Sequence, residues 1–241
     1  MSRIYEINGK KYPSVTTILS LLNKPALVPW AAKMTAAAFK NAVVSNIDTL
    51  NLDLLDEIEI ESKKIYRKKS EEAMSIGTRV HEIIEQWIQS DGKITPDEVS
   101  DPYAKKGLEA FLSWGEAREI EIVNNEVQVT DNKLFAGRYD LLAYVDGKLT
   151  LVDFKTSTGV WFEYWLQLGG YAIASDEPVE QIAVLRIDKE TGELEYLARE
   201  VWIPYASAFQ MLAQFYSMHA ELEALEKGMK RGDKNSKHKD Q

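Results

Sequence analysis

The chain has 241 residues, 45% of them hydrophobic, and it contains no cysteine. Without cysteine there can be no disulfide, zinc–thiolate site, iron–sulfur cluster or thiol nucleophile, so any metal must be held by oxygen and imidazole, which favours Mg²⁺ or Mn²⁺. No run of about eighteen apolar residues occurs, and the first residues lack the charged-then-apolar pattern of an export signal. We therefore expect one globular, cytoplasmic protein with no membrane partner.

The charged residues are unevenly distributed along the chain. The formal net charge of −9, taken as a sum, argues against a nucleic-acid partner. Acidic residues gather in 48–61, however, and basic residues follow in 63–69, with Tyr66 among them. Two interpretations of this basic segment stay open: a solvated helix face, or a strip that contacts phosphate beside an acidic site.

Helical segments dominate the first half of the chain. A small hairpin is predicted over residues 5–12 around the turn dipeptide Asn8-Gly9, followed by a helix with Ser14 as its N-cap. Hydrophobic periodicity predicts helices at 30–44, 65–89 and 102–118, whereas residues 46–60 fit either a helix or a loop.

Strands and helices alternate in the second half. The predicted elements, in chain order, are a strand near 121–130, a hairpin over 137–155, a helix over 160–174, a strand pair over 181–188 and 194–202, and a helix from 207 to about 230. The polar residues 231–241 are expected to be disordered. We find no internal repeat and no Gly-rich phosphate loop, which excludes an ATP-driven motor.

The hairpin is the most informative segment, because it carries charged residues in strands that should be buried. Asp146-Gly147 predicts a two-residue type I′ turn, and the pairing that follows places Asp140 opposite Asp153. Opposed side chains lie about 4.5–5.5 Å apart at Cβ, where two like charges are destabilising unless a positive charge lies between them. Lys155 projects from the same face as Asp153 because strand side chains alternate. The hairpin therefore predicts a divalent-cation site.

The alternative is an exposed sheet face on which these charges are merely solvated. The residues around these charges argue against an exposed face, because both predicted faces of the hairpin are apolar. One face carries Leu142, Tyr144, Leu149 and Leu151, and the other carries Tyr139, Leu141, Ala143, Val145, Val152 and Phe154. Such a strand pair is covered on both sides, and charges within it are costly to desolvate unless they are paired or bound to metal.

Two helical motifs supply further candidates. His81 lies one turn after Gly77, and a glycine within a helix usually marks a close approach, which favours His81 leaning over the carboxylates. Gln167 and Tyr171 share a helix face. Between them lies the pair Gly169-Gly170, whose cost to the helix must be offset by close packing or by a ligand. His219 and His238 have no comparable context.

Taken together, these motifs resemble a known family. Gly-x-x-x-His, Gly-Arg-x-Asp, Asp-Phe-Lys-Thr and Gln-x-x-x-Tyr, in this order, resemble the P-D-(D/E)-x-K nuclease superfamily, and in particular its RecB-like branch of phage exonucleases, recombination-helicase nuclease domains and the mitochondrial genome maintenance exonuclease. The opening Pro13-Ser-Val-Thr-Thr-Ile-Leu and Trp30-Ala resemble the stand-alone members, so the resemblance covers about residues 10–175.

The resemblance implies an α/β fold with a restriction-endonuclease-like core, in which a mixed central β-sheet is flanked by helices. It implies a helical N-terminal elaboration over 1–75 and a nuclease core over 76–230, within one domain. The chain departs from many members of the family in two respects. Asp153 stands where glutamate is common, and the cysteines that bind an iron–sulfur cluster in several members are absent.

Functional roles follow from the same resemblance. Asp140, Asp153 and Lys155 would be catalytic, Lys155 by orienting or activating the attacking water. The metal ligands would be His81, Asp140, Asp153 and the backbone carbonyl of Phe154. Gln167 and Tyr171 would position the DNA. Glu82, Glu85 and Glu126 are candidates for supporting positions behind the ligands.

The predicted activity is hydrolysis of phosphodiester bonds at DNA ends by a Mg²⁺- or Mn²⁺-dependent exonuclease, leaving 5′-phosphates, in phage or bacterial recombination, repair or replication. Partner proteins from those processes are compatible with this prediction. Two alternatives stay open: a structure-specific DNA endonuclease, and a DNA-end-binding accessory protein that retains the core without turnover. A small-molecule metal hydrolase has no supporting motif beyond the metal site.

Overall fold

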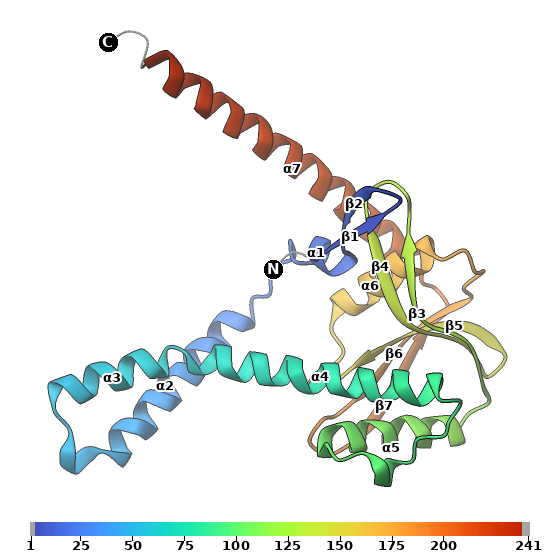
Figure 1. The fold of residues 1–241 in the computed structure, drawn as a ribbon, viewed down its shortest axis with the longest axis horizontal. Helices are drawn as coiled ribbons and strands as arrows, with labels where there is room; N and C mark the ends of the chain where they lie inside the picture. Colours follow the sequence, from blue (N-terminus) through green and yellow to red (C-terminus); the bar gives the residue numbers. More distant parts are fainter. Residues whose placement is uncertain (1–2, 238–241) are drawn as a thin grey trace.

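The computed structural model describes the backbone of residues 3–237 and the side chains of residues 3–228. The chain forms an α/β body from which two helical projections extend (Figure 1). The strands are β1 (Ile4–Ile7), β2 (Lys10–Pro13), β3 (Ile120–Thr130), β4 (Ala136–Val145), β5 (Lys148–Lys155), β6 (Gln181–Ile187) and β7 (Leu194–Arg199). The helices are α1 (Val15–Leu19), α2 (Leu27–Ser45), α3 (Leu52–Ser62), α4 (Ile65–Gln89), α5 (Pro102–Glu116), α6 (Phe162–Ala174) and α7 (Ile203–Lys237), with the 3-10 turns η1 (Ile47–Thr49) and η2 (Pro96–Glu98).

A five-stranded mixed sheet organises the body. Its strand order is β3-β4-β5-β6-β7, and neighbouring strands are antiparallel except for the parallel pair β5 and β6. This parallel pair requires a crossover connection, which α6 provides. The predicted fold class, an α/β fold with a mixed central sheet flanked by helices, is confirmed.

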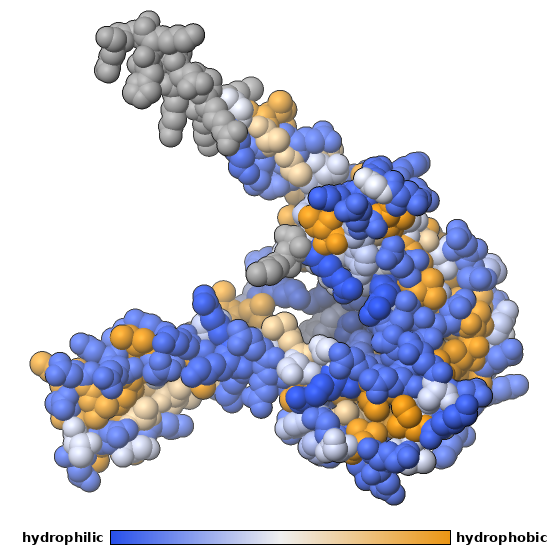
Figure 2. Space-filling view, in the orientation of Figure 1, coloured by the Kyte–Doolittle hydropathy of each residue, from blue (hydrophilic) through white to orange (hydrophobic). Residues whose placement is uncertain are grey.

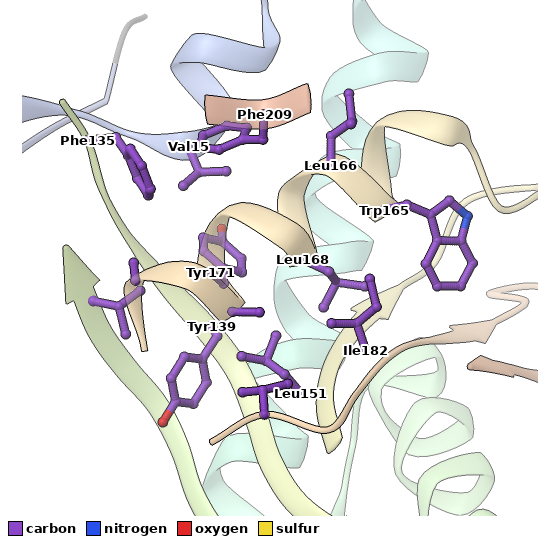
Figure 3. Close-up of a cluster of buried hydrophobic side chains, with 14 of the residues drawn as sticks. Val15, Phe135, Tyr139, Leu151, Trp165, Leu166, Leu168, Tyr171, Ile182 and Phe209 are labelled. Atoms are coloured by element: carbon purple, nitrogen blue, oxygen red, sulfur yellow. The ribbon is translucent and has the colours of Figure 1, made fainter. Parts of the chain in front are cut away.

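Helices cover both faces of the sheet, so each face buries its own hydrophobic cluster. On one face α1, α6 and the start of α7 pack over β4, β5 and β6, and Figure 3 shows the centre of this cluster around Tyr171, Leu168 and Phe209. On the other face α4 and α5 pack over the same strands through Ile84, Leu108 and other apolar residues. The buried parts of β4 and β5 are thereby covered by helices on both faces.

The N-terminal helical elaboration is an arm made of α2, α3 and the start of α4 (Figure 1). The segment 46–60, ambiguous in the sequence, contains η1 and α3, and Asn51 caps α3 by accepting a hydrogen bond from the backbone N–H of Leu54 at 2.9 Å. Helix α4 runs without interruption across position 75, the predicted boundary between the N-terminal part and the core. The two parts therefore share one continuous helix.

The C-terminal helix is longer than predicted at both ends. It begins at Ile203 and continues to Lys237, so residues 231–237 are helical where disorder was expected. The remaining residues of that predicted tail, 238–241, lie outside the described residues. Among the described residues, no helix combines the length and the apolar character needed to cross a membrane.

Candidate metal centre

The β4–β5 hairpin has the predicted turn and register. Asp146 and Gly147 both have positive φ, 51° and 79°, as a type I′ turn requires. Val145 pairs with Lys148, and the ladder continues in this register to Leu141 opposite Val152. The local sequence therefore predicted the alignment of the two strands correctly.

Beyond Leu141 the predicted alternation of side chains fails. Tyr139 packs in the cluster that contains Leu142 and Leu151, whereas Leu141 packs with Val152 on the opposite face. The prediction that Tyr139 shares a face with Leu141 is therefore wrong, because the alternation of β4 is interrupted at Asp140. Instead of lying in a regular ladder opposite Asp153, Asp140 accepts a hydrogen bond at Oδ2 from the backbone N–H of Phe154, at 2.7 Å.

Asp140 faces helix α4 through His81. The distance from His81 Nδ1 to Asp140 Oδ2 is 3.5 Å, and the His81 ring packs edge-on against Phe154 with centroids 5.7 Å apart. Gly77 permits this approach of α4, because a Cβ added there would lie 3.0 Å from Thr156 Oγ1. The close approach that this glycine predicted is thus observed at the end of β5.

Asp153 faces helix α6 and is the most deeply buried carboxylate of the group, with its side chain 2% exposed. Its Oδ1 accepts a hydrogen bond from Gln167 Nε2 at 3.0 Å, and its Oδ2 forms an ion pair with Lys155. The Lys155 ammonium also lies over the Tyr164 ring, 4.9 Å from its centroid. A buried charge is thus matched by an opposite charge and a hydrogen bond, as its desolvation demands.

A third carboxylate, Glu126 on β3, joins the site. Asn125 pairs with Leu141 and Val127 pairs with Tyr139, so Glu126 lies opposite Asp140, in a left-handed backbone conformation with φ of 54°. Potential ligand atoms of His81, Glu126 and Asp140 all lie within 4.8 Å of one another. Glu126 also forms an ion pair with Arg138.

The sequence identified Glu126 only as a supporting candidate. The reason is that β3 changes register between Ile122 and Asn124. Counting residues from the Asp146-Gly147 turn gives the pairing of β4 with β5, but it does not reveal a bulge in β3. Asp153 is held by Lys155 and Gln167 and is not part of the three-residue group. Phe154, predicted to ligate through its carbonyl, contributes its N–H to Asp140.

The carboxyl groups titrate differently because their surroundings differ. Burial raises the pKa of Asp153 to about 6, with Lys155 opposing this rise and Asp140 adding to it. Burial also raises the pKa of Glu126 to about 7, and the charge on Asp140 contributes. For Asp140 burial acts in the same sense, but His81 and Lys155 outweigh it and hold the pKa below its usual value.

The two basic groups respond to these carboxylates. Burial alone would lower the pKa of His81, but the Asp140 carboxylate prevails and raises it. Burial opposes the charge on Lys155 as well, and Asp153 and Asp140 together raise its pKa. The site therefore concentrates negative charge that His81 and Lys155 offset.

The two predicted substrate-binding residues differ in their surroundings: Gln167 contacts the Asp153 carboxylate, whereas Tyr171 lies in the hydrophobic core. Gln167 donates to Asp153 and lies 3.1 Å from the Tyr171 hydroxyl. Tyr171 is buried, and its ring occupies the space that a Cβ at Gly137 would need, at 2.4 Å. Tyr171 thus reaches the site through its hydroxyl alone, as part of the core shown in Figure 3.

Other motifs singled out in the sequence have structural explanations. A Cβ at Gly169 would lie 2.6 Å from Ala206 N, so the Gly169-Gly170 pair allows α6 and α7 to pack closely. In the basic segment 63–69, Lys63 pairs with Glu59, and both Lys64 and Lys68 pair with Glu61. These ion pairs favour the interpretation of a solvated helix face. His219 lies on α7 beside Glu223, and His238 lies outside the described residues.

The residues of the site fit a hard divalent cation. The available ligands are carboxylate oxygens and an imidazole nitrogen, the donor set that suits Mg²⁺ or Mn²⁺. Burial, with a contribution from Asp140, raises the pKa of both Asp153 and Glu126, and a bound cation would favour the ionised form of each carboxylate. The arrangement could therefore hold one or more divalent cations beside the Lys155 ammonium.

Comparisons with known proteins do not assign the chain to a family. No protein-family model matches the chain, and no curated protein matches it. Solved structures similar to the chain include one described as "Crystal structure of SSO0001", with 15% sequence identity over 75% of this chain and 86% of that chain, at a TM-score of 0.28. A likeness this low carries no argument about function, which depends on the site alone.

Proposed function

We propose that this chain is a divalent-metal-dependent deoxyribonuclease that removes nucleotides from DNA ends and leaves 5′-phosphates. One observation carries the proposal: His81, Glu126 and Asp140 converge at the end of the hairpin where Asp153 pairs with Lys155. Carboxylates that gather beside a buried lysine match the requirements of phosphodiester hydrolysis, in which charge on the phosphate must be stabilised and a water activated. The sequence motifs that resemble nucleases include His81, Asp140, Asp153 and Lys155, whereas Glu126 lies outside them.

Each residue has a separate task in this proposal. His81, Asp140 and Glu126 would hold the metal, together with Asp153. Once bound, the cation would polarise the scissile phosphate and lower the pKa of a water molecule. Lys155 is fixed by Asp153 and Tyr164, so its ammonium places a positive charge where negative charge develops on the phosphate. Gln167 keeps Asp153 oriented through its amide.

The shape of the molecule is compatible with a nucleic-acid substrate. Figure 2 shows a notch between the helical arm and α7, lined in part by hydrophilic residues, and α4 borders this notch in Figure 1. Helix α4 also carries His81 to the site.

The decisive assay compares end-labelled linear DNA with closed circular DNA, single and double stranded, in Mg²⁺, Mn²⁺ or EDTA. We expect linear DNA to be shortened from its ends with either metal, and no reaction with EDTA. Cutting of closed circles would replace the exonuclease by the endonuclease alternative. Binding of ends without any cleavage would favour the accessory-protein alternative.

Variants separate this site from contaminating activity. Asp153→Ala should abolish cleavage because it removes a proposed ligand, and Lys155→Ala should lower the rate by about 10²- to 10³-fold because it removes the stabilising ammonium. Asp146→Asn is the matched control, since Asp146 belongs to the same hairpin but lies at its opposite, exposed end. Full activity in Asp153→Ala would rule out the proposed site.

A further inference from the structure

Helix α7 carries a stripe of exposed apolar side chains that its own chain does not cover. The stripe consists of Met211, Phe215, Met218, Leu222 and Leu225, which are between 56% and 71% exposed. Their spacing alternates between four and three residues, the heptad repeat by which two helices pack side chains into each other's holes. Residues that face the body, including Phe209 and Ala213, lie on another side of the helix.

The outer part of α7 is exposed on all sides along its described length. From Met218 to Gly228 every described side chain is exposed, and in Figure 1 the helix extends away from the body. Figure 2 shows hydrophobic side chains on this projecting length. A single helix without tertiary packing is only marginally stable in water, and a contiguous apolar stripe on a surface marks an interaction site.

We infer that this stripe is a self-association surface, on which α7 of a second copy packs to form a two-stranded antiparallel coiled coil. A heptad stripe packs best against another helix that carries the same spacing. The α7 helix of a second copy is such a helix. Covering roughly 100 Å² on each of five side chains in both copies buries about 1,000 Å² in total, the size that a specific interface requires.

Charge determines the orientation of the two helices. A parallel, in-register pair would bring Glu221 next to the second copy's Glu226 on both sides of the seam, and like charges at these flanking positions are unfavourable. An antiparallel pair instead places Glu221 against the neutral Gln214 of the second copy. The surface therefore favours the antiparallel dimer.

The test measures the mass of the full chain in solution by light scattering across a concentration series. One chain has a mass of 27.4 kDa, so a dimer should double this value at micromolar concentration. Leu222→Glu should return the mass to that of one chain. Ala224→Glu is the matched control, because position 224 lies on the same exposed helix outside the stripe, and this variant should stay dimeric. Thermal unfolding of the α/β body verifies that both variants stay folded, and any loss of helical circular dichroism on dissociation should be limited to the outer turns of α7.

Several results would overturn the inference. A chain that is monomeric throughout the series has no self-association surface, and a dimer that survives Leu222→Glu uses another surface. Equal dissociation by Ala224→Glu would show that the stripe is not the contact. Because the natural chain has no cysteine, orientation is tested with Met211→Cys under oxidation. An antiparallel pair leaves the two cysteines apart, whereas crosslinking at that position would contradict the antiparallel arrangement.

Discussion

The two ends of the β4–β5 hairpin carry the same kinds of residue in opposite surroundings. At the turn, Asp146 pairs with Arg118 and Lys148 pairs with Glu200, and all four side chains are at least one-third exposed. At the open end, Asp153 pairs with Lys155, and both side chains are largely buried. Exposed pairs contribute at most about 1 kcal/mol, whereas a buried pair is costly to break.

The difference arises from the helices that cover the strands. Helix α4 brings His81 to Asp140 and helix α6 brings Gln167 to Asp153, both at the open end. At the turn, Lys148 and Glu200 keep their charged groups in contact with solvent. A charged strand residue is therefore informative about function only once the elements that pack above and below it are known.

The largest expected contrast is between Asp140→Asn and Asp146→Asn. Asp140 contributes an anionic oxygen beside His81 and the Phe154 N–H, so its loss should lower DNA hydrolysis by about 10³-fold or more and weaken Mn²⁺ binding. Asparagine tolerates the positive φ of 51° at position 146, so that variant should keep its activity within about twofold. Nuclease rates and Mn²⁺ titration calorimetry measure both effects, and equal losses in the two variants would contradict the comparison.

The next contrast separates the charge of Lys155 from metal binding. Lys155→Ala should lower the hydrolysis rate by about 10²- to 10³-fold, as expected when a preorganised positive charge is removed. Mn²⁺ affinity should persist, because the ammonium is not a ligand. Lys148→Ala, on the same strand but paired with Glu200 at the surface, should retain activity. If Mn²⁺ binding were lost together with activity in Lys155→Ala, the lysine would act by holding the ligands in place.

These contrasts also show what could be predicted from the sequence. The turn at Asp146-Gly147 and the pairing up to Leu141 were predicted because a two-residue turn and strand alternation are local properties. The grouping of His81 with Asp140 depends on long-range packing, yet Gly77 gave a local indication of the close approach. The candidate residues at the open end do converge in the structure.

The failures have a common physical cause. The face of Tyr139 was predicted wrongly, and the position of Glu126 beside Asp140 could not be predicted, because irregularities in β3 and β4 change which way a side chain points. Segment 46–60 was ambiguous because α3 buries only Ile58 and Ser62 and so has little apolar periodicity. Tertiary packing and bulges are not encoded in any short window of the sequence.

Without metal, the free energy of unfolding should depend on pH because of the buried ionisable groups at the open end of the hairpin. The pKa of Asp153 is raised from 3.8 to about 6, so its protonated form stabilises the fold. This contribution is complete below about pH 4 and is lost as the pH rises through 6, a change of about 3 kcal/mol. The raised pKa of His81 acts in the same direction. Urea unfolding in EDTA between pH 4.5 and 7.5 should show this loss.

The matched measurement uses Asp153→Asn, which cannot ionise at this position. Its stability should fall less than that of the natural chain over the same pH range, and the difference between the two curves isolates the Asp153 contribution. Parallel curves would show that the carboxyl titrates alike in the folded and unfolded states, and that the open end is less buried than its contacts indicate.

The smallest effects are expected from two glycines, Gly77 on α4 beside the open end of the hairpin and Gly147 in its turn, and they should be opposite in kind. Gly77→Ala places a Cβ 3.0 Å from Thr156 Oγ1, so Thr156 must move away from α4 by a few tenths of an ångström, next to the end of β5 that His81 approaches. Alanine also favours the helix by about 1 kcal/mol, so stability should change little while activity falls a few-fold.

Gly147→Ala should do the reverse. A Cβ at position 147 meets no atom within 4 Å, but the residue needs its φ of 79°, which costs alanine about 1 kcal/mol or more. Because the turn lies at the far end of the hairpin, activity at saturating metal should remain. Thermal unfolding and nuclease rates together resolve the two cases. If both glycines changed stability and activity in proportion, the two ends of the hairpin would not be functionally separate.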